Sequence, residues 1–291
     1  PKSTAAAWIP SPASFAFSQA SLQDYVDCPR RFQLRYVERL AWPTPVAEPM
    51  LEVEAHLARG LDFHRLVYQH ALGLDPATIG ESISDAKLAM WWEAYLSHPL
   101  ELPGRRFPEI GVSTSLGGHR LVAQFDLVAA APGERLVIVD WKTNEGRRPR
   151  REWLAKRLQT RVYRYVLAQA GQRFNQGEPV DPSWVEMIYW FAAFPAQPER
   201  FGYDPAELEQ DRGDLEALVG EIEAAVAQAG SGAAGLAQAR GDATCRYCRY
   251  ASYCEREAGA ATADDLEGQA DEGAPGAGFD LGLEQVAEVE F

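Results

Sequence analysis

Three features that would each assign the chain to a class of protein are missing. No apolar stretch approaches the roughly 18 residues that a membrane-spanning helix needs, and no apolar run follows a basic start as in a signal peptide. The chain also has no Gly-x4-Gly-Lys-Ser/Thr phosphate loop, which excludes a nucleotide-driven motor within it. Together these absences predict a cytoplasmic protein that has no membrane partner and keeps its thiols reduced.

Basic residues are missing from the C-terminal end. The net charge is −14, but residues 203–291 hold 20 acidic and 5 basic residues, whereas residues 1–202 hold 22 acidic and 23 basic residues. No Lys or Arg follows Arg256, while ten carboxylates do. We therefore expect residues 257–291 to form an acidic, disordered tail. The balanced charge of residues 1–202 leaves nucleic acid open as a partner.

The chain has only four cysteines, and more than two hundred residues separate the first from the other three. Cys28 stands alone, and Cys245, Cys248 and Cys254 form a C-x2-C-x5-C triplet. In a reducing compartment this spacing indicates metal ligation rather than disulfides. Zinc sites usually use two close pairs, whereas a triplet with one remote thiolate fits a [4Fe–4S] cluster. We favour the cluster, with zinc as the alternative.

The order of helical and strand patterns predicts an α/β core between two helical parts. Ser21-Leu-Gln-Asp24 resembles a capping box and Pro29 restarts a helix, which puts Cys28 at a junction between helices. Apolar alternation then predicts an antiparallel meander, a helix from Pro149 and a further strand. The predicted strands are 110–116, 120–130, 135–143 and 184–194, and the predicted parts are 1–104 (helical, with Cys28 and His64), 105–202 (the α/β core), 203–256 (a helix capped at Asp204 and the cysteine triplet) and 257–291 (the tail).

Two carboxylates stand out in strands that are otherwise apolar. Alternation along the strand puts Asp140 and Lys142 on one face at its end, while Val137 and Val139 face the other way. Asp126 interrupts the apolar run of the preceding strand. A buried carboxylate needs a partner, and a divalent cation between Asp126 and Asp140 would supply one. The alternative is a buried Asp satisfied by Lys142 or by backbone amides.

The helix after this strand combines polar and basic residues. Gln159 and Tyr163 are four residues apart and therefore share a face. The stretch 147–164 contains one acid, Glu152, and eight basic residues that suit a polyanion, although a solvated charged face is the common alternative. The eight basic residues are Arg147, Arg148, Arg150, Arg151, Lys156, Arg157, Arg161 and Arg164. Upstream, the run Arg59-Gly60-Leu-Asp-Phe-His64 places an imidazole in an amphipathic helix, where a single His is more often structural.

The order of these motifs resembles the PD-(D/E)XK nuclease superfamily, and within it the RecB-like branch. The motifs are His64, Asp126, Asp140-Trp-Lys142 and Gln159-x3-Tyr163. Cys28-Pro-Arg-Arg-Phe and the cysteine triplet resemble the iron–sulfur subgroup, which includes AddB-type nuclease domains and CRISPR adaptation nucleases. The resemblance implies a mixed central sheet flanked by helices, with a helical N-terminal extension and a C-terminal iron–sulfur clasp. One departure is Val122-Ala-Gln124, where relatives often have Gly shortly before the first Asp.

The resemblance also implies a role for each matching residue. Asp126 and Asp140 would bind Mg²⁺ or Mn²⁺ together with His64 and the carbonyl of Trp141, and Glu109 is an additional acidic candidate. Lys142 would orient or help to deprotonate the attacking water. Gln159 and Tyr163 would hold either the DNA backbone or the active-site strand. Cys28, Cys245, Cys248 and Cys254 would hold the cluster.

These roles predict a metal-dependent DNA nuclease that acts on single strands or DNA ends in repair, recombination or related DNA processing. A separate helicase or another DNA-processing protein is an expected partner. The alternative is a non-catalytic DNA-binding or assembly subunit of a helicase–nuclease complex, in which the cluster is structural.

Overall fold

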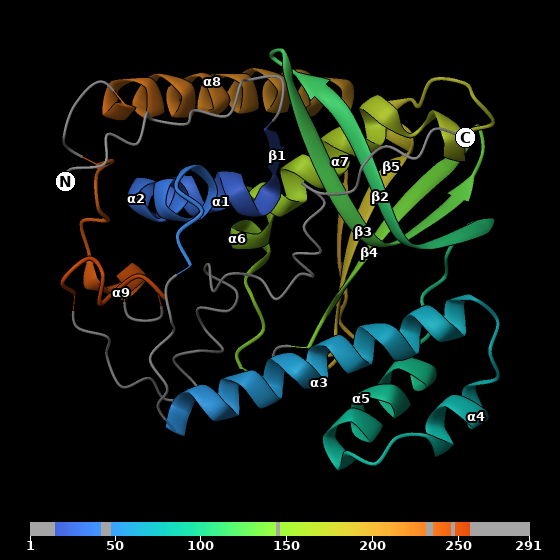
Figure 1. Cartoon of the computed structure of the whole chain (residues 1–291). Coiled ribbons are helices and arrows are strands. Elements are labelled where there is room, and N and C mark those ends of the chain that lie inside the picture. The colour runs from blue at the N-terminus through green and yellow to red at the C-terminus, as the bar shows by residue number, and fades with distance from the viewer. Residues whose placement is uncertain (1–14, 42–47, 144–145, 231–234, 246–247, 257–291) are drawn as a thin grey trace.

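A computed structural model of the chain describes residues 15–41, 48–143, 146–230, 235–245 and 248–256 (Figure 1). The predicted acidic tail lies outside these residues. The predicted division into four parts stays a prediction, whereas the predicted α/β fold is confirmed. Among the described residues, no helix combines the length and apolar character needed to cross a membrane.

A mixed sheet of six strands forms the centre of the molecule. The antiparallel meander predicted from the sequence is confirmed as β2–β3–β4, and β5 then pairs parallel to β4, with β6 antiparallel at the edge. β1 pairs parallel to β3. The strands are β1 (Ala16–Ser18), β2 (Arg105–Leu116), β3 (His119–Ala131), β4 (Arg135–Lys142), β5 (Val185–Phe191) and β6 (Glu199–Gly202).

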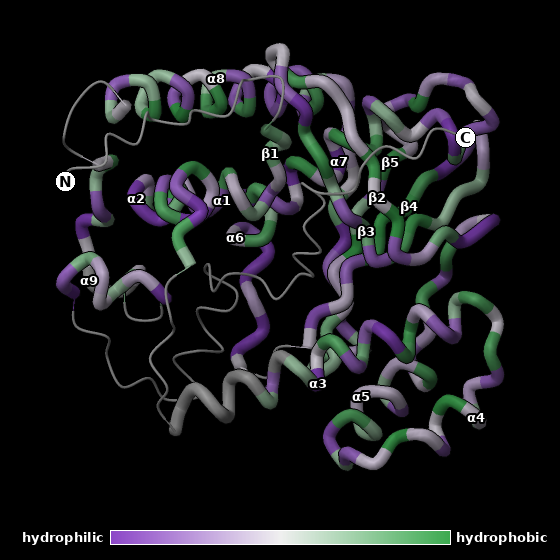
Figure 2. The backbone as a smooth tube through the Cα atoms, viewed as in Figure 1, coloured by the Kyte–Doolittle hydropathy of each residue, from purple (hydrophilic) through white to green (hydrophobic). Residues whose placement is uncertain are grey.

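Helices cover both faces of the sheet. One face packs against α1, α7 and α8, and the other packs against α3, α4 and α5, which form a separate group below the sheet in Figure 1. The hydropathy colouring shows the apolar strands β3, β4 and β5 between these layers (Figure 2). The helices are α1 (Gln19–Asp27), α2 (Pro29–Phe32), η1 (Gln33–Val37), α3 (Glu48–Ala71), α4 (Pro76–Glu81), α5 (Ala86–Ser97), α6 (Arg151–Lys156), α7 (Leu158–Ala170), η2 (Gln172–Phe174), η3 (Pro182–Trp184), α8 (Pro205–Gly230) and α9 (Asp242–Cys245).

Two local predictions differ from the structure. The capping box of α1 uses Ser18 and Ser21, each side chain bonding the backbone N–H of the other, and not Ser21 with Asp24. The helix predicted from Pro149 is two helices, because Arg157 between α6 and α7 has an extended backbone (φ −61°, ψ 138°). Cys28 does lie at a helix junction, as predicted, since it ends α1 and precedes α2.

Candidate active site

The end of β4 places a carboxylate and an ammonium on the same face of the sheet. Asp140 is 3% exposed, and its Oδ2 lies 2.8 Å from Nζ of Lys142. The alternate residues Val137 and Val139 pack on the opposite face, in the core beneath α3 and α5. The alternation therefore orients Asp140 and Lys142 as the sequence predicts, towards α7.

Asp126 lies where β3 and β4 separate. The last paired residues of these strands are Leu127 and Val139. One step further on, the Oδ2 of Asp126 accepts a hydrogen bond from the backbone N–H of Trp141 at 2.8 Å. A side-chain oxygen thus satisfies a buried donor that would otherwise lose its partner in the sheet. Asp126 both ends the pairing of the two strands and sits beside the start of the Asp140-Trp-Lys142 motif.

α3 brings His64 over Asp126 because the helix approaches β4 closely. A Cβ at Gly60, one turn before His64, would lie 3.0 Å from Oγ1 of Thr143. With glycine there, Nδ1 of His64 reaches to 3.5 Å from Oδ2 of Asp126. Burial would lower the pKa of His64, but the charge and hydrogen bond of Asp126 outweigh it and raise the pKa to about 9.

Glu109 joins His64 and Asp126 from β2. One ligand atom from each of these three residues lies within 4.8 Å of the others. The backbone of Glu109 is left-handed (φ 47°), which is unfavourable for a residue with a Cβ. Burial, followed by the charge of Asp126, raises the pKa of its carboxyl to about 7. Local backbone strain and crowded acids therefore coincide at this point.

Asp140 lies beside this group of three. Burial raises its pKa to about 6, with Asp126 adding to the effect and Lys142 opposing it. Its buried Oδ2 accepts no hydrogen bond of good geometry, and it forms an ion pair with the ammonium of Lys142. Carboxylate oxygens with one imidazole suit a divalent cation such as Mg²⁺ or Mn²⁺, and the crowded negative charge fits one. Trp141 contributes its N–H here, and ligation by its carbonyl stays a prediction.

Gln159 and Tyr163 line the side of the site that α7 covers. Nε2 of Gln159 donates to Oδ1 of Asp140 at 2.7 Å, and its Oε1 accepts from Lys142 at 3.1 Å. Tyr163 is buried against Phe125, with their rings 5.1 Å apart and perpendicular. The two roles that the resemblance implies for this pair stay predictions, and in the structure Gln159 bonds Asp140 and Lys142 while Tyr163 packs on β3.

Half of the predicted basic surface is held within the protein. Arg148 and Arg151 both bond Glu199. Arg161 pairs with two carboxylates of α8, and the buried Arg164 bonds the carbonyl of Gly202 at the end of β6. These four side chains tie α6 and α7 to neighbouring elements.

Of the remaining basic residues, three are exposed and one is half-buried. Arg147, Arg150 and Lys156 are exposed, and the guanidinium of Arg157 lies 4.5 Å from the ring centre of Trp153.

Two residues that no sequence pattern singled out also reach the site. Tyr189 of β5 and Thr160 of α7 are buried and hydrogen bonded at 2.7 Å between their hydroxyl groups. The hydroxyl of Tyr189 within the apolar strand 184–194 is the sequence feature that could have indicated this residue.

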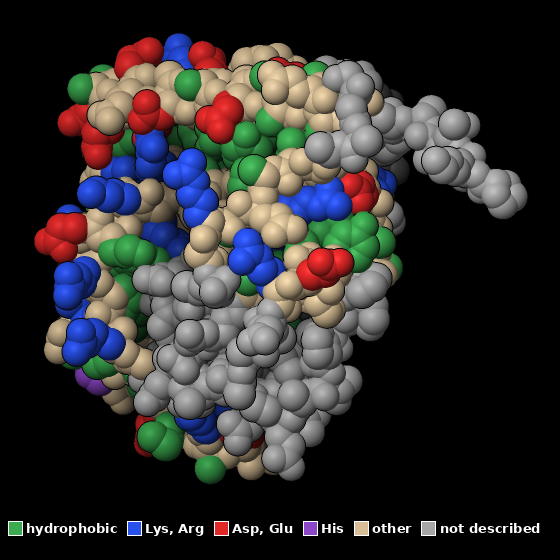
Figure 3. Space-filling model, turned by 90° about the vertical axis from the view of Figure 1, so that its left-hand side faces the viewer, with side chains coloured by type: hydrophobic (Ala, Val, Ile, Leu, Met, Phe, Trp, Pro, Cys, Tyr) green, Lys and Arg blue, Asp and Glu red, His purple; other side chains and the backbone are tan. Residues whose placement is uncertain are grey.

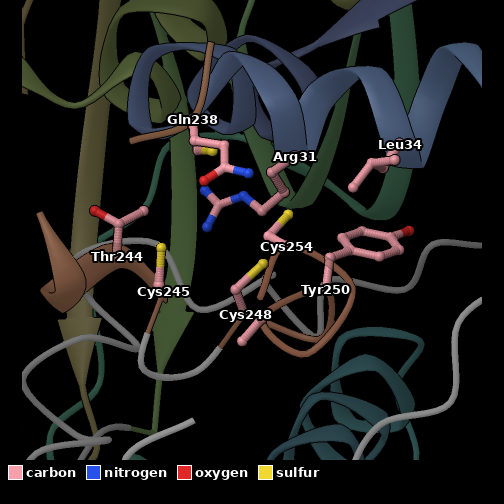
Figure 4. Close-up of a pocket in the computed structure, with 10 residues that line it drawn as sticks. Arg31, Leu34, Gln238, Thr244, Cys245, Cys248, Tyr250 and Cys254 are labelled. Atoms are coloured by element: carbon pink, nitrogen blue, oxygen red, sulfur yellow. The ribbon is translucent and has the colours of Figure 1, made fainter. Parts of the chain in front are cut away.

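The four cysteines line one pocket, although Cys28 lies far from the other three in sequence (Figure 4). None is in a disulfide. The segment that carries the triplet docks on the N-terminal helices, since the Tyr250 hydroxyl donates to the carbonyl of Leu40 and the backbone of Arg30 donates to Ala237. Burial raises the pKa of the Cys248 thiol, and the charge of Arg31 in the same pocket opposes this. The pocket is lined by Cys28, Arg31, Leu34, Gln238, Thr244, Cys245, Cys248, Tyr250, Ala251 and Cys254.

Two solved structures resemble this chain at low sequence identity. The crystal structure of "Putative exonuclease" from Eubacterium rectale is 13% identical, with 86% of this chain and 92% of that chain covered and a TM-score of 0.48. The crystal structure of SSO0001 is also 13% identical, with 82% and 85% covered and a TM-score of 0.37. Among curated proteins no match was found. A family comparison matches residues 16–255, which include every candidate residue described above, and the chain therefore belongs to the PD-(D/E)XK nuclease superfamily.

Proposed function

We propose that the chain is a Mg²⁺- or Mn²⁺-dependent deoxyribonuclease that acts on single strands or DNA ends. One observation carries the proposal. His64, Glu109 and Asp126 gather ligand atoms within 4.8 Å, directly beside a buried Asp140 that is paired with Lys142. A structural role would not need a strained Glu109 whose carboxylate lies within 4.8 Å of that of Asp126, with the buried Asp140 beside them.

The residues divide into two tasks. Glu109, Asp126, Asp140 and His64 would hold the cation, which when bound shields the phosphate charge and lowers the pKa of its water. Lys142 is 23% exposed at its side chain, so its ammonium can reach a substrate while Asp140 holds it. It would orient the attacking water and balance the negative charge that develops on the phosphate. Gln159 would keep both Asp140 and Lys142 in place.

The charge of the surface supports a polyanionic substrate. Arg147, Arg150 and Lys156 are exposed on the segment that follows β4. Lys and Arg side chains also gather on the face that carries α2 and α9, whereas acidic side chains lie above them along α8 (Figure 3). A phosphate backbone would be attracted to the basic regions and repelled by α8. Repair or recombination with a separately encoded helicase is the process we propose for this activity.

Cleavage of end-labelled single-stranded DNA tests the proposal. We expect products with Mg²⁺ or Mn²⁺, none with EDTA, and none from Asp140→Ala or Lys142→Ala at unchanged melting temperature. Glu93→Ala, which removes an exposed acid on α5, is the control and should cleave like the wild type. Metal-dependent DNA binding without cleavage by the wild type would instead favour the non-catalytic subunit, unless a co-purifying helicase restores cleavage.

We also propose that Cys28, Cys245, Cys248 and Cys254 bind a [4Fe–4S] cluster that clasps the two ends of the chain. Four thiols without disulfides in one pocket support this. The purified protein should be brown and contain iron and sulfide. Cys28→Ser should lose the colour and lower the melting temperature by about 5 °C or more, with Ser252→Ala as the control. If the purified protein contains stoichiometric zinc and no iron, the four cysteines form a zinc site and not an iron–sulfur cluster.

A further inference from the structure

Lys142 has a third neighbour besides Asp140 and Gln159. Its Nζ lies 5.5 Å from the ring centre of Tyr189 in β5, within the range of a cation–π contact. An ammonium carries three N–H groups. Two of its sides face the Oδ2 of Asp140 at 2.8 Å and the Oε1 of Gln159 at 3.1 Å. The ring of Tyr189 is thus an apolar surface against the reactive end of this side chain.

The ring of Tyr189 is held in a fixed orientation. Its side chain is fully buried, and its Oη lies 2.7 Å from Oγ1 of Thr160. Oγ1 of Thr160 also lies 2.6 Å from the carbonyl oxygen of Leu154. A carbonyl can only accept, so the single proton of Thr160 goes to Leu154, and Tyr189 must donate to Thr160.

This assignment leaves the oxygen of Gln159 for Lys142. The Oη of Tyr189 lies 3.5 Å from Oε1 of Gln159, but its proton is already given to Thr160. The amide oxygen therefore keeps its capacity for the ammonium. The hydroxyl of Thr160, in the first turn of α7, orients Tyr189, and Tyr189 contacts one side of Lys142.

We propose that Tyr189 is a positioning residue for Lys142, anchored by Thr160, and that its ring holds the ammonium in the orientation in which it meets the substrate. The inference rests on the proposed nuclease function. The opposing interpretation is that Tyr189 only fills the core, since its ring also packs against Phe191 and Phe201 at 6.4 Å and 6.0 Å between ring centres.

Three variants separate these interpretations. Tyr189→Leu removes the ring, Tyr189→Phe keeps the ring and removes the hydroxyl, and Phe191→Leu is the matched control. Phe191 is buried on the same face, and it is paired with Lys142 in the register of β4 and β5. If packing alone supports Lys142, then Phe191→Leu should harm the reaction as much as Tyr189→Leu does.

The measurement is kcat and KM for cleavage of single-stranded DNA with Mn²⁺, together with the melting temperature of each variant. We expect Tyr189→Leu to lower kcat about tenfold, the value of a partly exposed cation–π contact, with KM unchanged. Tyr189→Phe loses the bond to Thr160 but keeps the ring packed against Phe191 and Phe201, so kcat should fall by no more than about threefold. Phe191→Leu should destabilise the protein as much as Tyr189→Leu but lower kcat far less.

Equal losses of kcat in Tyr189→Leu and Phe191→Leu would overturn the inference, and so would a loss in Tyr189→Phe as large as that in Tyr189→Leu. Either result with an active wild type leaves the proposed nuclease function intact. An inactive wild type under every metal condition overturns the proposed function and this inference with it.

Discussion

Replacing Gly60 with alanine should lower the catalytic rate, although the same substitution in the middle of a helix normally stabilises a protein. In the middle of a helix, Gly→Ala normally stabilises by about 1 kcal/mol, because glycine loses more backbone entropy on folding. Gly220 in α8 shows the ordinary case, since a Cβ there has nothing within 4 Å. At Gly60 the new Cβ would lie 3.0 Å from Oγ1 of Thr143, closer than ordinary contact. α3 must therefore move away from β4, or Thr143 must turn.

The displacement needed is about 0.4 Å, which is close to the tolerance of a catalytic group. Because His64 lies one turn further along α3, over Asp126, we expect Gly60→Ala to lower kcat about tenfold. Gly220→Ala should raise the unfolding free energy by about 1 kcal/mol and leave kcat unchanged. Thr143→Ala removes the obstructing oxygen, so Gly60→Ala/Thr143→Ala should recover most of the activity.

Stopped-flow single-turnover cleavage and urea unfolding measure the two quantities on the same preparations. Wild-type cleavage by Gly60→Ala would refute the argument that the glycine permits the close approach. So would a double variant that remains as slow as Gly60→Ala, because the contact with Thr143 would then not be the cause.

Three further predictions concern charge and strain. Glu109→Gly should raise the unfolding free energy by about 1 kcal/mol more than Glu109→Gln does, because both variants remove a repelled charge but only glycine relieves the left-handed backbone. Both variants should abolish cleavage, and urea unfolding together with the cleavage assay measures the two effects. Arg161→Ala should lower the unfolding free energy by about 3 kcal/mol in urea unfolding, because it leaves the buried Asp211 without its cation. Arg147→Ala should change the unfolding free energy by less than about 0.5 kcal/mol and should weaken DNA binding. Binding of Mn²⁺ at pH 7.5 should release about one proton from His64, because its pKa of about 9 keeps it charged in the free protein. Calorimetry in two buffers of different ionisation enthalpy measures this release, and binding without proton release would contradict the prediction.

The sequence predicted those parts of the site that depend on local periodicity. Alternation along β4 placed Asp140 and Lys142 together, and helical spacing placed Gln159 and Tyr163 on one face. These relations hold wherever the strand or helix is formed, so the sheet order was not needed. The family order of the motifs then indicated that the elements meet.

The partners of the basic residues could not be predicted in this way. A count of charges along 147–164 does not show which way each side chain faces. Arg161 bonds Asp211, 50 residues later, because α8 folds back over α7. A salt bridge of that kind depends on how two helices pack, and no local pattern encodes it. The left-handed backbone of Glu109 is equally hidden, because it arises from the packing of β2 against β3 around the site.

Charge balance explains why the site tolerates so many acids. When ionised, Glu109, Asp126 and Asp140 carry three negative charges, and Lys142 together with a protonated His64 supplies two positive charges. Below about pH 7, protonation of Glu109, whose pKa is raised to about 7, offsets the remaining negative charge in the free protein. A divalent cation with a neutral His64 would bring the same five groups to zero, because two charges from the metal and one from Lys142 match three carboxylates. The protons on His64 and Glu109 therefore supply the positive charge that the cation would bring. They allow the fold to keep a cluster of acids that would repel one another if all were ionised.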